Sequence, residues 1–163
     1  MVFEFWPAAA AGAIGGALMT LMRMLMRAAG IDLKADIPNL WGTMLKVHGP
    51  TGRLLGLLIH LVGSAAIGLV YAWAFSLLHI DADLWFWGLL GGAIHWWIAG
   101  IFMGVLPAIH PEMPDGQHAP GFFLWRYRGP DVPVFLIGHL MYGAAVGVLY
   151  GLFHANGGWG TSF

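Results

Sequence analysis

The chain has 163 residues, of which 59% are hydrophobic and only 9% are charged, and its formal net charge is −1 at pH 7. A soluble domain covers its surface with far more charged side chains, so this composition excludes one and predicts an integral membrane protein. The absence of cysteine excludes disulfides, iron–sulfur clusters and c-type haem, and the lack of a basic stripe argues against a nucleic-acid partner.

Four apolar runs are each long enough to cross a bilayer, for which ~20 helical residues suffice. We predict transmembrane helices at about 5–26, 54–78, 84–106 and 132–154. These runs and their connections occupy almost the whole sequence. Residues 1–163 are therefore predicted to form one all-α transmembrane domain with no separate soluble part.

Charged residues are distributed unevenly among the connections between these runs. The second connection carries only Asp81 and Asp83, and no Lys or Arg lies near either terminus. Because cytoplasmic loops are enriched in Lys and Arg, we predict that the first and third connections are cytoplasmic and that both termini lie outside. These two connections and their edges contain all seven basic residues: Arg23, Arg27, Lys34, Lys46, Arg53, Arg126 and Arg128.

The first connection contains an amphipathic segment. Hydrophobic side chains recur with helical spacing from Ile37 to Leu45, and Asp36, which begins the sequence Asp-Ile-Pro, is predicted to be the N-cap of a helix. We predict a short helix at about 37–47. The pattern fits a helix in the cytoplasmic interface of the membrane with Trp41 inward, and equally a helix that caps the end of the bundle.

A twelve-residue segment occurs twice in the chain. Residues 60–71 read HLVGSAAIGLVY and residues 139–150 read HLMYGAAVGVLY, with six identical positions. The earlier segments GAIGGA and GLLGGA form a second matching pair, 76 residues apart. We predict two tandem repeats, at about 5–79 and 84–154, which each cross the membrane twice and therefore run parallel to one another.

Small residues recur every four positions along the predicted helices, which places them on one face of each helix. In a membrane, such faces let helix backbones approach closely. The residues predicted to pack helices in this way are Gly12, Gly16, Ser64, Gly68, Gly88, Gly92, Gly143 and Gly147.

Each repeat carries a histidine on its small-residue face. His60 and His139 are repeat-related, and both are predicted to lie roughly 10 Å from the cytoplasmic ends of their helices. Neutral imidazole is a common haem ligand, so this pair predicts a site for haem b or another tetrapyrrole. Met19 and His95 are also repeat-related and predict a second cofactor site. The alternative is that the histidines hydrogen-bond carbonyl or tyrosine oxygens and hold the helices together.

The third connection combines candidate metal ligands with several prolines. His110 and His118 flank Glu112 and Asp115 and predict a cytoplasmic metal site that uses two imidazoles and a carboxylate. Their spacing matches no regular metal-binding motif, and the prolines favour an irregular loop. Under this alternative interpretation, the polar side chains only contact water.

The four apolar runs, the Asp-Ile-Pro segment after the first of them and the repeated HLxxxAAxGxxY pattern resemble small bacterial inner-membrane proteins of the uncharacterised YagU-like type. The resemblance spans most of the chain. It implies a multi-pass protein of the bacterial cytoplasmic membrane, and it assigns no activity and no functional residues.

No nucleophile–base pair, phosphate-binding loop or pair of intramembrane carboxylates is recognisable, so neither catalytic residues nor an enzymatic activity is predicted. We predict a non-catalytic subunit of a larger, bioenergetic membrane complex, in contact with the lipid bilayer and with other integral membrane subunits or further copies of itself. One alternative is an electron-transfer subunit that binds a tetrapyrrole through His60 and His139. The other is a small oligomeric transporter or channel.

Overall fold

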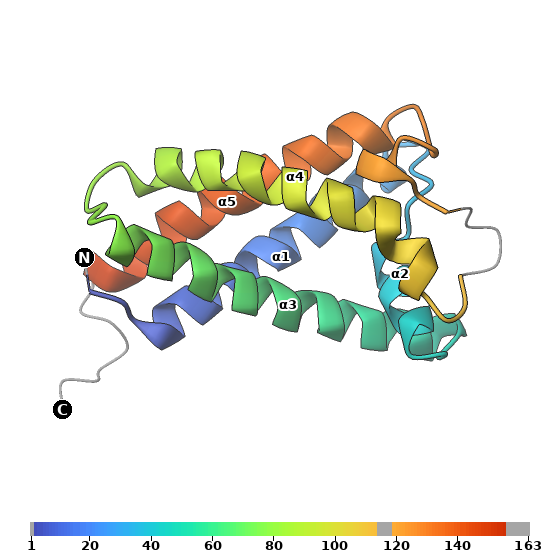
Figure 1. Cartoon of the computed structure of the whole chain (residues 1–163), viewed down its shortest axis with the longest axis horizontal. Coiled ribbons are helices and arrows are strands. Elements are labelled where there is room, and N and C mark those ends of the chain that lie inside the picture. The colour runs from blue at the N-terminus through green and yellow to red at the C-terminus, as the bar shows by residue number, and fades with distance from the viewer. Residues whose placement is uncertain (1, 114–118, 156–163) are drawn as a thin grey trace. The chain divides into compact units, whose positions relative to one another are not determined.

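The computed structural model describes residues 2–113 and 119–155, and the regular elements in this part of the chain are all helices. Four of them are long and apolar enough to cross a membrane, so the prediction of an all-α, multi-pass membrane protein is confirmed. The elements, shown in Figure 1, are α1 (Phe5–Ala28), α2 (Ile37–Met44), α3 (Gly49–Leu77), α4 (Leu84–Ile109), the 3₁₀ helix η1 (Phe122–Leu124) and α5 (Asp131–Ala155).

Two helices extend beyond their predicted ends because the structure accommodates a proline inside each. α3 begins at Gly49 instead of at about 54, since Pro50 lies in the first turn, where its missing N–H has no helical partner to lose. α4 continues through Pro107 instead of ending at about 106. The N–H of His110 still binds the carbonyl oxygen of Leu106 at 2.9 Å, which closes the last turn.

The chain forms two compact units, and each of the four long helices contributes a stretch to both. The division therefore crosses the helices and does not follow the two predicted repeats. The first unit comprises the described residues of Met1–Met19, Leu61–Ala93 and His139–Phe163, and the second comprises those of Thr20–His60 and Ile94–Gly138.

Buried tyrosines fill the core of the first unit. Tyr142 and Tyr150 are almost inaccessible, and the ring of Tyr71 packs edge-on against that of Tyr142 at a centroid distance of 5.8 Å. The Tyr142 hydroxyl donates a hydrogen bond to the carbonyl oxygen of Ser64 at 2.6 Å, which joins α5 to α3. Because a hydrogen bond stabilises a buried hydroxyl, this bond fixes the orientation of the ring in the core.

Glycines bring two pairs of helices into direct contact in the first unit. A Cβ atom added at Gly12 of α1 would collide with the backbone of Ser64 and Gly68 in α3. In the same way, a Cβ atom added at Gly88 of α4 would collide with the backbone of Gly143 in α5. Each pair therefore packs backbone against backbone, at positions that the internal sequence similarity matches.

The second unit has its own apolar core, to which α2 contributes Leu40. Trp41 of α2 stacks on Phe102 of α4, with ring centroids 6.1 Å apart. A backbone contact between Gly42 and Gly52 holds α2 against the first turns of α3. α2 is thus packed within the unit, and its place relative to the membrane interface stays a prediction. The buried members of this core are Ala35, Leu40, Met103, Leu106, Leu124 and Phe135.

α2 begins, as predicted, at an N-cap formed by Asp36. The carboxylate accepts a hydrogen bond from the N–H of Asn39 at 3.2 Å and also pairs with the guanidinium of Arg53 at 3.1 Å. The helix ends at Met44, about three residues earlier than predicted. The chain leaves the helix there because Lys46 adopts a left-handed conformation with a φ of 59°.

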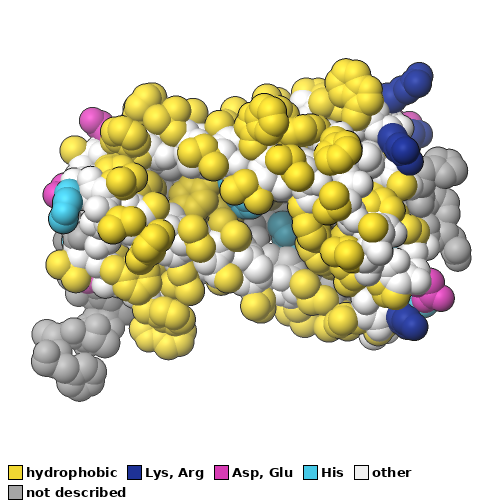
Figure 2. Space-filling model, in the orientation of Figure 1, with side chains coloured by type: hydrophobic (Ala, Val, Ile, Leu, Met, Phe, Trp, Pro, Cys, Tyr) yellow, Lys and Arg dark blue, Asp and Glu magenta, His cyan; other side chains and the backbone are white. Residues whose placement is uncertain are grey.

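Large hydrophobic side chains dominate the outer surface. On the part of α4 that belongs to the second unit, the side chains of Ile94, Trp97 and Ile98 are all more than half exposed. Figure 2 shows many hydrophobic side chains on the visible surface of each unit, and the visible Lys and Arg side chains lie at the end of the second unit that carries α2 in Figure 1. An apolar surface of this kind suits contact with lipid or with other membrane helices.

Candidate functional site

The structure places the predicted cofactor ligands in different units. His139 is buried in the first unit, and Met19 lies against the core of that unit. His60 and His95 are partly buried and belong to the second unit. The three histidines each interact already with another group of the chain. Each predicted pair of ligands therefore has one member in each unit, and the tetrapyrrole sites stay predictions.

The glycines near His139 bring α4 and α5 into direct contact in the first unit. A Cβ atom at Gly92 of α4 would collide with the carbonyl oxygen of His139, and one at Gly143 of α5 would collide with Gly88. Helices in direct contact lie about 8–10 Å apart, which is too close for a macrocycle between them. Any tetrapyrrole bound by His139 would have to lie on another side of α5.

His110 follows the last turn of α4 and is buried in the second unit. Its Nδ1 accepts a hydrogen bond from the N–H of Glu112 at 3.1 Å, so the ring proton is assigned to Nε2. Nε2 lies 3.0 Å from the carbonyl oxygen of Leu40 and 3.4 Å from the hydroxyl of Thr43. Both ring nitrogens thus form hydrogen bonds with groups of the protein itself, and His110 links the end of α4 to α2.

Glu112, the candidate carboxylate ligand in the described part of the third connection, binds a side chain of the first connection. Glu112 pairs with His48 at 3.0 Å, and both side chains are about half exposed. Within the described residues, no group of three His, Asp or Glu side chains is arranged to hold a metal ion. Asp115 and His118 lie outside the described residues, so the metal site at His110 and His118 stays a prediction.

Asp131, the first residue of α5, is a fully buried acidic residue of the second unit. Its Oδ2 accepts the N–H of Lys34 at 2.7 Å. Its Oδ1 accepts the N–H of Ala35 and a guanidinium N–H of Arg23, both at 3.1 Å. A buried carboxylate is stable only when it is paired and hydrogen-bonded, and these three donors meet that requirement.

Two arginines near the end of α1 bind carbonyl oxygens of the segment 31–36, which also contains the two N–H groups that bind Asp131. Arg23 donates a hydrogen bond to the carbonyl oxygen of Ala35 at 2.8 Å. Arg27 donates to the same oxygen at 2.7 Å and to the carbonyl oxygen of Leu33 at 3.2 Å. This segment has no regular secondary structure, so these bonds replace those that a helix would supply. We call Arg23, Arg27 and Asp131 the Arg–Asp cluster.

The Arg–Asp cluster is not predicted from the sequence, although the sequence contains one relevant signal. Arg23 is the only charged residue inside the predicted spans, and a charge within a membrane requires a partner. Asp131 immediately precedes the predicted fourth helix, where an acidic residue is common in any protein. Only the structure shows that these two residues, 108 positions apart, form an ion pair.

Tyr127 precedes α5 and packs against the core of the second unit. Its hydroxyl oxygen is buried and has no hydrogen-bond partner among the described residues. Burial, and secondly the negative charge of Asp131, raise the pKa of Tyr127 to about 12. The phenol is therefore neutral at physiological pH and adds no charge to the unit.

The Arg–Asp cluster and His110 share one chemical role, because both bind backbone groups at the ends of helices. Arg23 and Asp131 hold the segment between α1 and α2, and His110 holds α2 against α4. The arrangement fixes the connections between membrane helices. No protein family, curated protein or solved structure in the comparisons matches this chain.

Proposed function

We propose that this protein is a non-catalytic, multi-pass subunit of a larger complex in the bacterial cytoplasmic membrane. Polar side chains buried in each unit support the proposal, because they bind the chain's own backbone. Asp131 and His110 do so in the second unit, and Tyr142 does so in the first. Polar groups used in this way stabilise a scaffold.

An open face on α3 in the first unit carries the proposal. Among the described residues, no atom outside the adjoining backbone of α3 lies within 4 Å of the position that a Cβ atom would occupy at Gly63, whereas Gly12 and Gly68 make backbone contacts with each other's helices. Glycine inside a helix costs about 0.5–1 kcal/mol relative to alanine, so a glycine that no other helix contacts among the described residues needs another reason. Close approach by a helix of a partner subunit is such a reason.

The residues around Gly63 have the character of a helix-packing surface. Ala66 is also exposed, and Val62 and Val70 on the same side of α3 are 70% and 55% exposed. Under the duplication that we propose, Gly63 corresponds to Tyr142, whose ring is buried in the first unit. The first repeat thus has no large ring at this position, which leaves space for a partner. We call Val62, Gly63, Ala66 and Val70 the α3 face.

The proposal includes two parallel repeats and an orientation with both termini outside. The matched glycine contacts of α1 with α3, and of α4 with α5, support the parallel repeats. All seven Lys and Arg residues belong to the second unit, whereas Asp81 and Asp83 belong to the first. The positive-inside rule then assigns the basic connections, with α2 among them, to the cytoplasm.

Extraction from membranes at native expression with a mild detergent tests the proposal. We expect the wild-type chain to migrate in a complex larger than itself, and Gly63→Leu to release it as a smaller species. A Cβ atom added at Gly63 meets open space among the described residues, so the variant should fold like the wild type. Ala17→Leu, which adds similar bulk at an exposed position of α1, is the matched control and should leave the complex intact.

A wild-type chain that migrates alone would refute the proposal. A complex that survives Gly63→Leu would show that the α3 face is not the docking surface. The absorption spectrum of the same preparation tests the tetrapyrrole alternative, which predicts a visible band that is lost in His60→Ala and in His139→Ala. A colourless, folded complex would exclude that alternative.

A further inference from the structure

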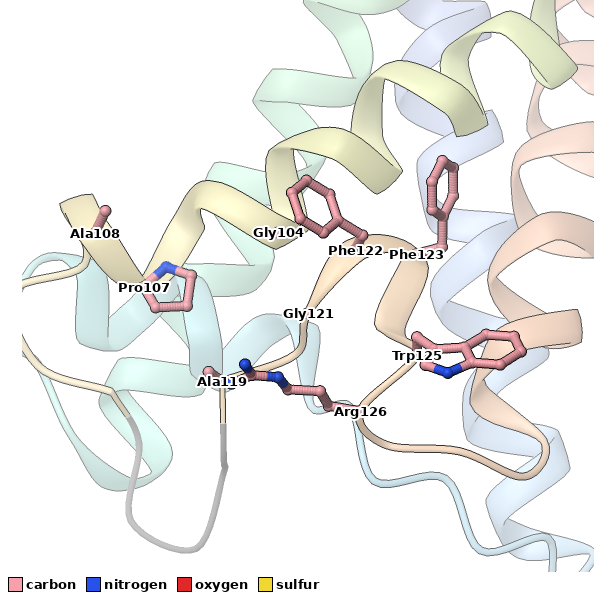
Figure 3. Close-up of a pocket in the computed structure, with 9 residues that line it drawn as sticks. All are labelled: Gly104, Pro107, Ala108, Ala119, Gly121, Phe122, Phe123, Trp125 and Arg126. Atoms are coloured by element: carbon pink, nitrogen blue, oxygen red, sulfur yellow. The ribbon is translucent and has the colours of Figure 1, made fainter.

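A pocket of about 570 Å³ lies in the second unit, where the last turns of α4 meet the segment that contains η1 (Figure 3). It is distinct from the α3 face, so the two proposals are independent. Gly104, Pro107 and Ala108 of α4 form one wall. Phe122 and Arg126 belong to the facing segment, and Arg126 is the charged side chain among the described lining residues.

Contacts between aromatic rings and glycines of α4 hold the apolar wall in place. The ring of Phe122 lies against Gly104, where an added Cβ atom would collide with it. The ring of Phe123 occupies the corresponding place at Gly100, and its centroid lies 4.7 Å from that of Trp96. The pocket is therefore a built feature of the second unit, because its aromatic wall is packed against a helix on one side.

The backbone that presents these rings is strained. Phe123 and Leu124 have φ angles of 54° and 61°, in the left-handed region that residues other than glycine rarely adopt. Strain of this kind persists where the surrounding structure requires it, and it is concentrated at binding sites. The resulting bend places the ring of Phe122 beside α4 while the side chain of Arg126 extends toward Ala119 (Figure 3).

The pocket lies at the end of a membrane-length helix. α4 ends at Ile109, so Gly104 and Ala108 are within roughly 8 Å of its end along the helix axis. Phe122 and Trp125 are 53% and 71% exposed, and exposed tryptophan is typical of the headgroup level of a membrane. A phospholipid at this level has its acyl chains beside the helix and its phosphate near the end of the helix.

Arg126 supplies the polar end of the pocket. Its side chain is exposed and forms no ion pair with another described residue. A guanidinium that has no carboxylate partner among the described residues, and that lies beside an apolar cavity, suits a phosphate group, which it binds through two parallel hydrogen bonds. We propose that the pocket binds an anionic phospholipid, with the phosphate at Arg126 and an acyl chain against Pro107 and Phe122.

Native mass spectrometry of the full chain in detergent tests this proposal, with titrations of phosphatidylglycerol and of phosphatidylcholine that carry the same acyl chains. We expect phosphatidylglycerol to bind about fivefold more tightly, which is the effect of one basic side chain on an anionic lipid. Arg126→Gln should abolish this preference. Arg128→Gln removes another exposed arginine that does not line the pocket, and it should preserve the preference.

Ala108→Phe provides a second variant, which fills the pocket from an exposed wall without a change of charge and should weaken the binding of both lipids. Equal binding of the two lipids by the wild-type chain would overturn the proposal, as would equal losses in Arg126→Gln and Arg128→Gln. Displacement of the lipid by millimolar inorganic phosphate would show that the site recognises free phosphate, and this result would also overturn the assignment of a lipid.

Discussion

At the scale of single residues, burial rather than distance distinguishes two arginine–aspartate pairs among the described residues of the second unit. Asp131 is inaccessible and the side chain of Arg23 is only 13% exposed, so their pair at 3.1 Å is shielded from solvent. Arg53 and Asp36 have the same separation of 3.1 Å, but the arginine side chain is 60% exposed. Solvent screens the second pair and leaves the first almost unscreened.

We expect Asp131→Asn to destabilise the protein by about 3–5 kcal/mol, because the guanidinium of Arg23 then stays buried without a counter-charge. Arg53→Gln is the matched control at the exposed pair and should cost about 1 kcal/mol or less. Denaturant titration of both variants in detergent micelles measures the free energies of unfolding. Equal losses in the two variants would contradict a stabilising role for the buried pair.

Because of Tyr127, the stability of the folded protein depends on pH in the alkaline range. Its pKa is about 12 in the folded protein, above the ordinary value of 10.0, so the folded state holds the phenolic proton more tightly than the unfolded state does. The stabilisation that this difference in pKa provides is complete below the ordinary pKa of 10.0, and it is lost as the pH rises through the folded-state pKa of about 12. The alkaline loss of stability should therefore contain a component that belongs to Tyr127.

We expect Tyr127→Phe to reduce the loss of stability between the two pKa values. At neutral pH the substitution should be neutral or stabilising, because it removes a buried hydroxyl that has no hydrogen-bond partner among the described residues. Unfolding measurements on both proteins across this range provide the test. Superimposable alkaline profiles would show that Tyr127 titrates equally in the folded and unfolded states.

At the scale of helices, glycine has opposite roles according to its surroundings. Gly88 of α4 is in backbone contact with Gly143 of α5, whereas Gly63 of α3 faces open space. Both occupy helical positions within apolar runs, so the local pattern does not separate them. The difference lies in which helix, if any, the chain places opposite each glycine.

We expect Gly88→Ala to destabilise the protein by about 1–3 kcal/mol, because the new Cβ atom would collide with the carbonyl oxygen of Gly143. Gly63→Ala is the same substitution at the open position and should be neutral or stabilise by up to about 1 kcal/mol, since alanine is the better helix former. The free energies of unfolding of the two variants, measured in detergent micelles, provide the comparison. Destabilisation of equal size would contradict the direct pairing of α4 with α5.

At the scale of the whole molecule, the uneven distribution of charge predicts a measurable orientation. The chain contains no cysteine, so single cysteines introduced at the exposed positions Lys46 and Asp81 can be labelled without background. We expect a membrane-impermeant maleimide to label Asp81→Cys in intact cells, and Lys46→Cys only after the membrane is opened. The reverse pattern would invert the proposed orientation.

The sequence by itself determined the helical class and most of the bounds of the four membrane-length helices, because length and apolarity are local properties. It also predicted the N-cap at Asp36, where donor and acceptor lie three residues apart. The ends at Pro50 and Pro107 differ from the prediction, since a proline breaks a helix in one position and is accommodated in another.

Only the tertiary structure decided which groups meet across the chain. It paired Arg23 with Asp131, placed His110 against Leu40, and left Gly63 open while other glycines are in contact. Each of these facts depends on segments that are distant in sequence, and hydrophobic periodicity reports only the local backbone and its apolar face. The buried partners of a polar side chain follow from the packing of several helices at once, which no single segment encodes.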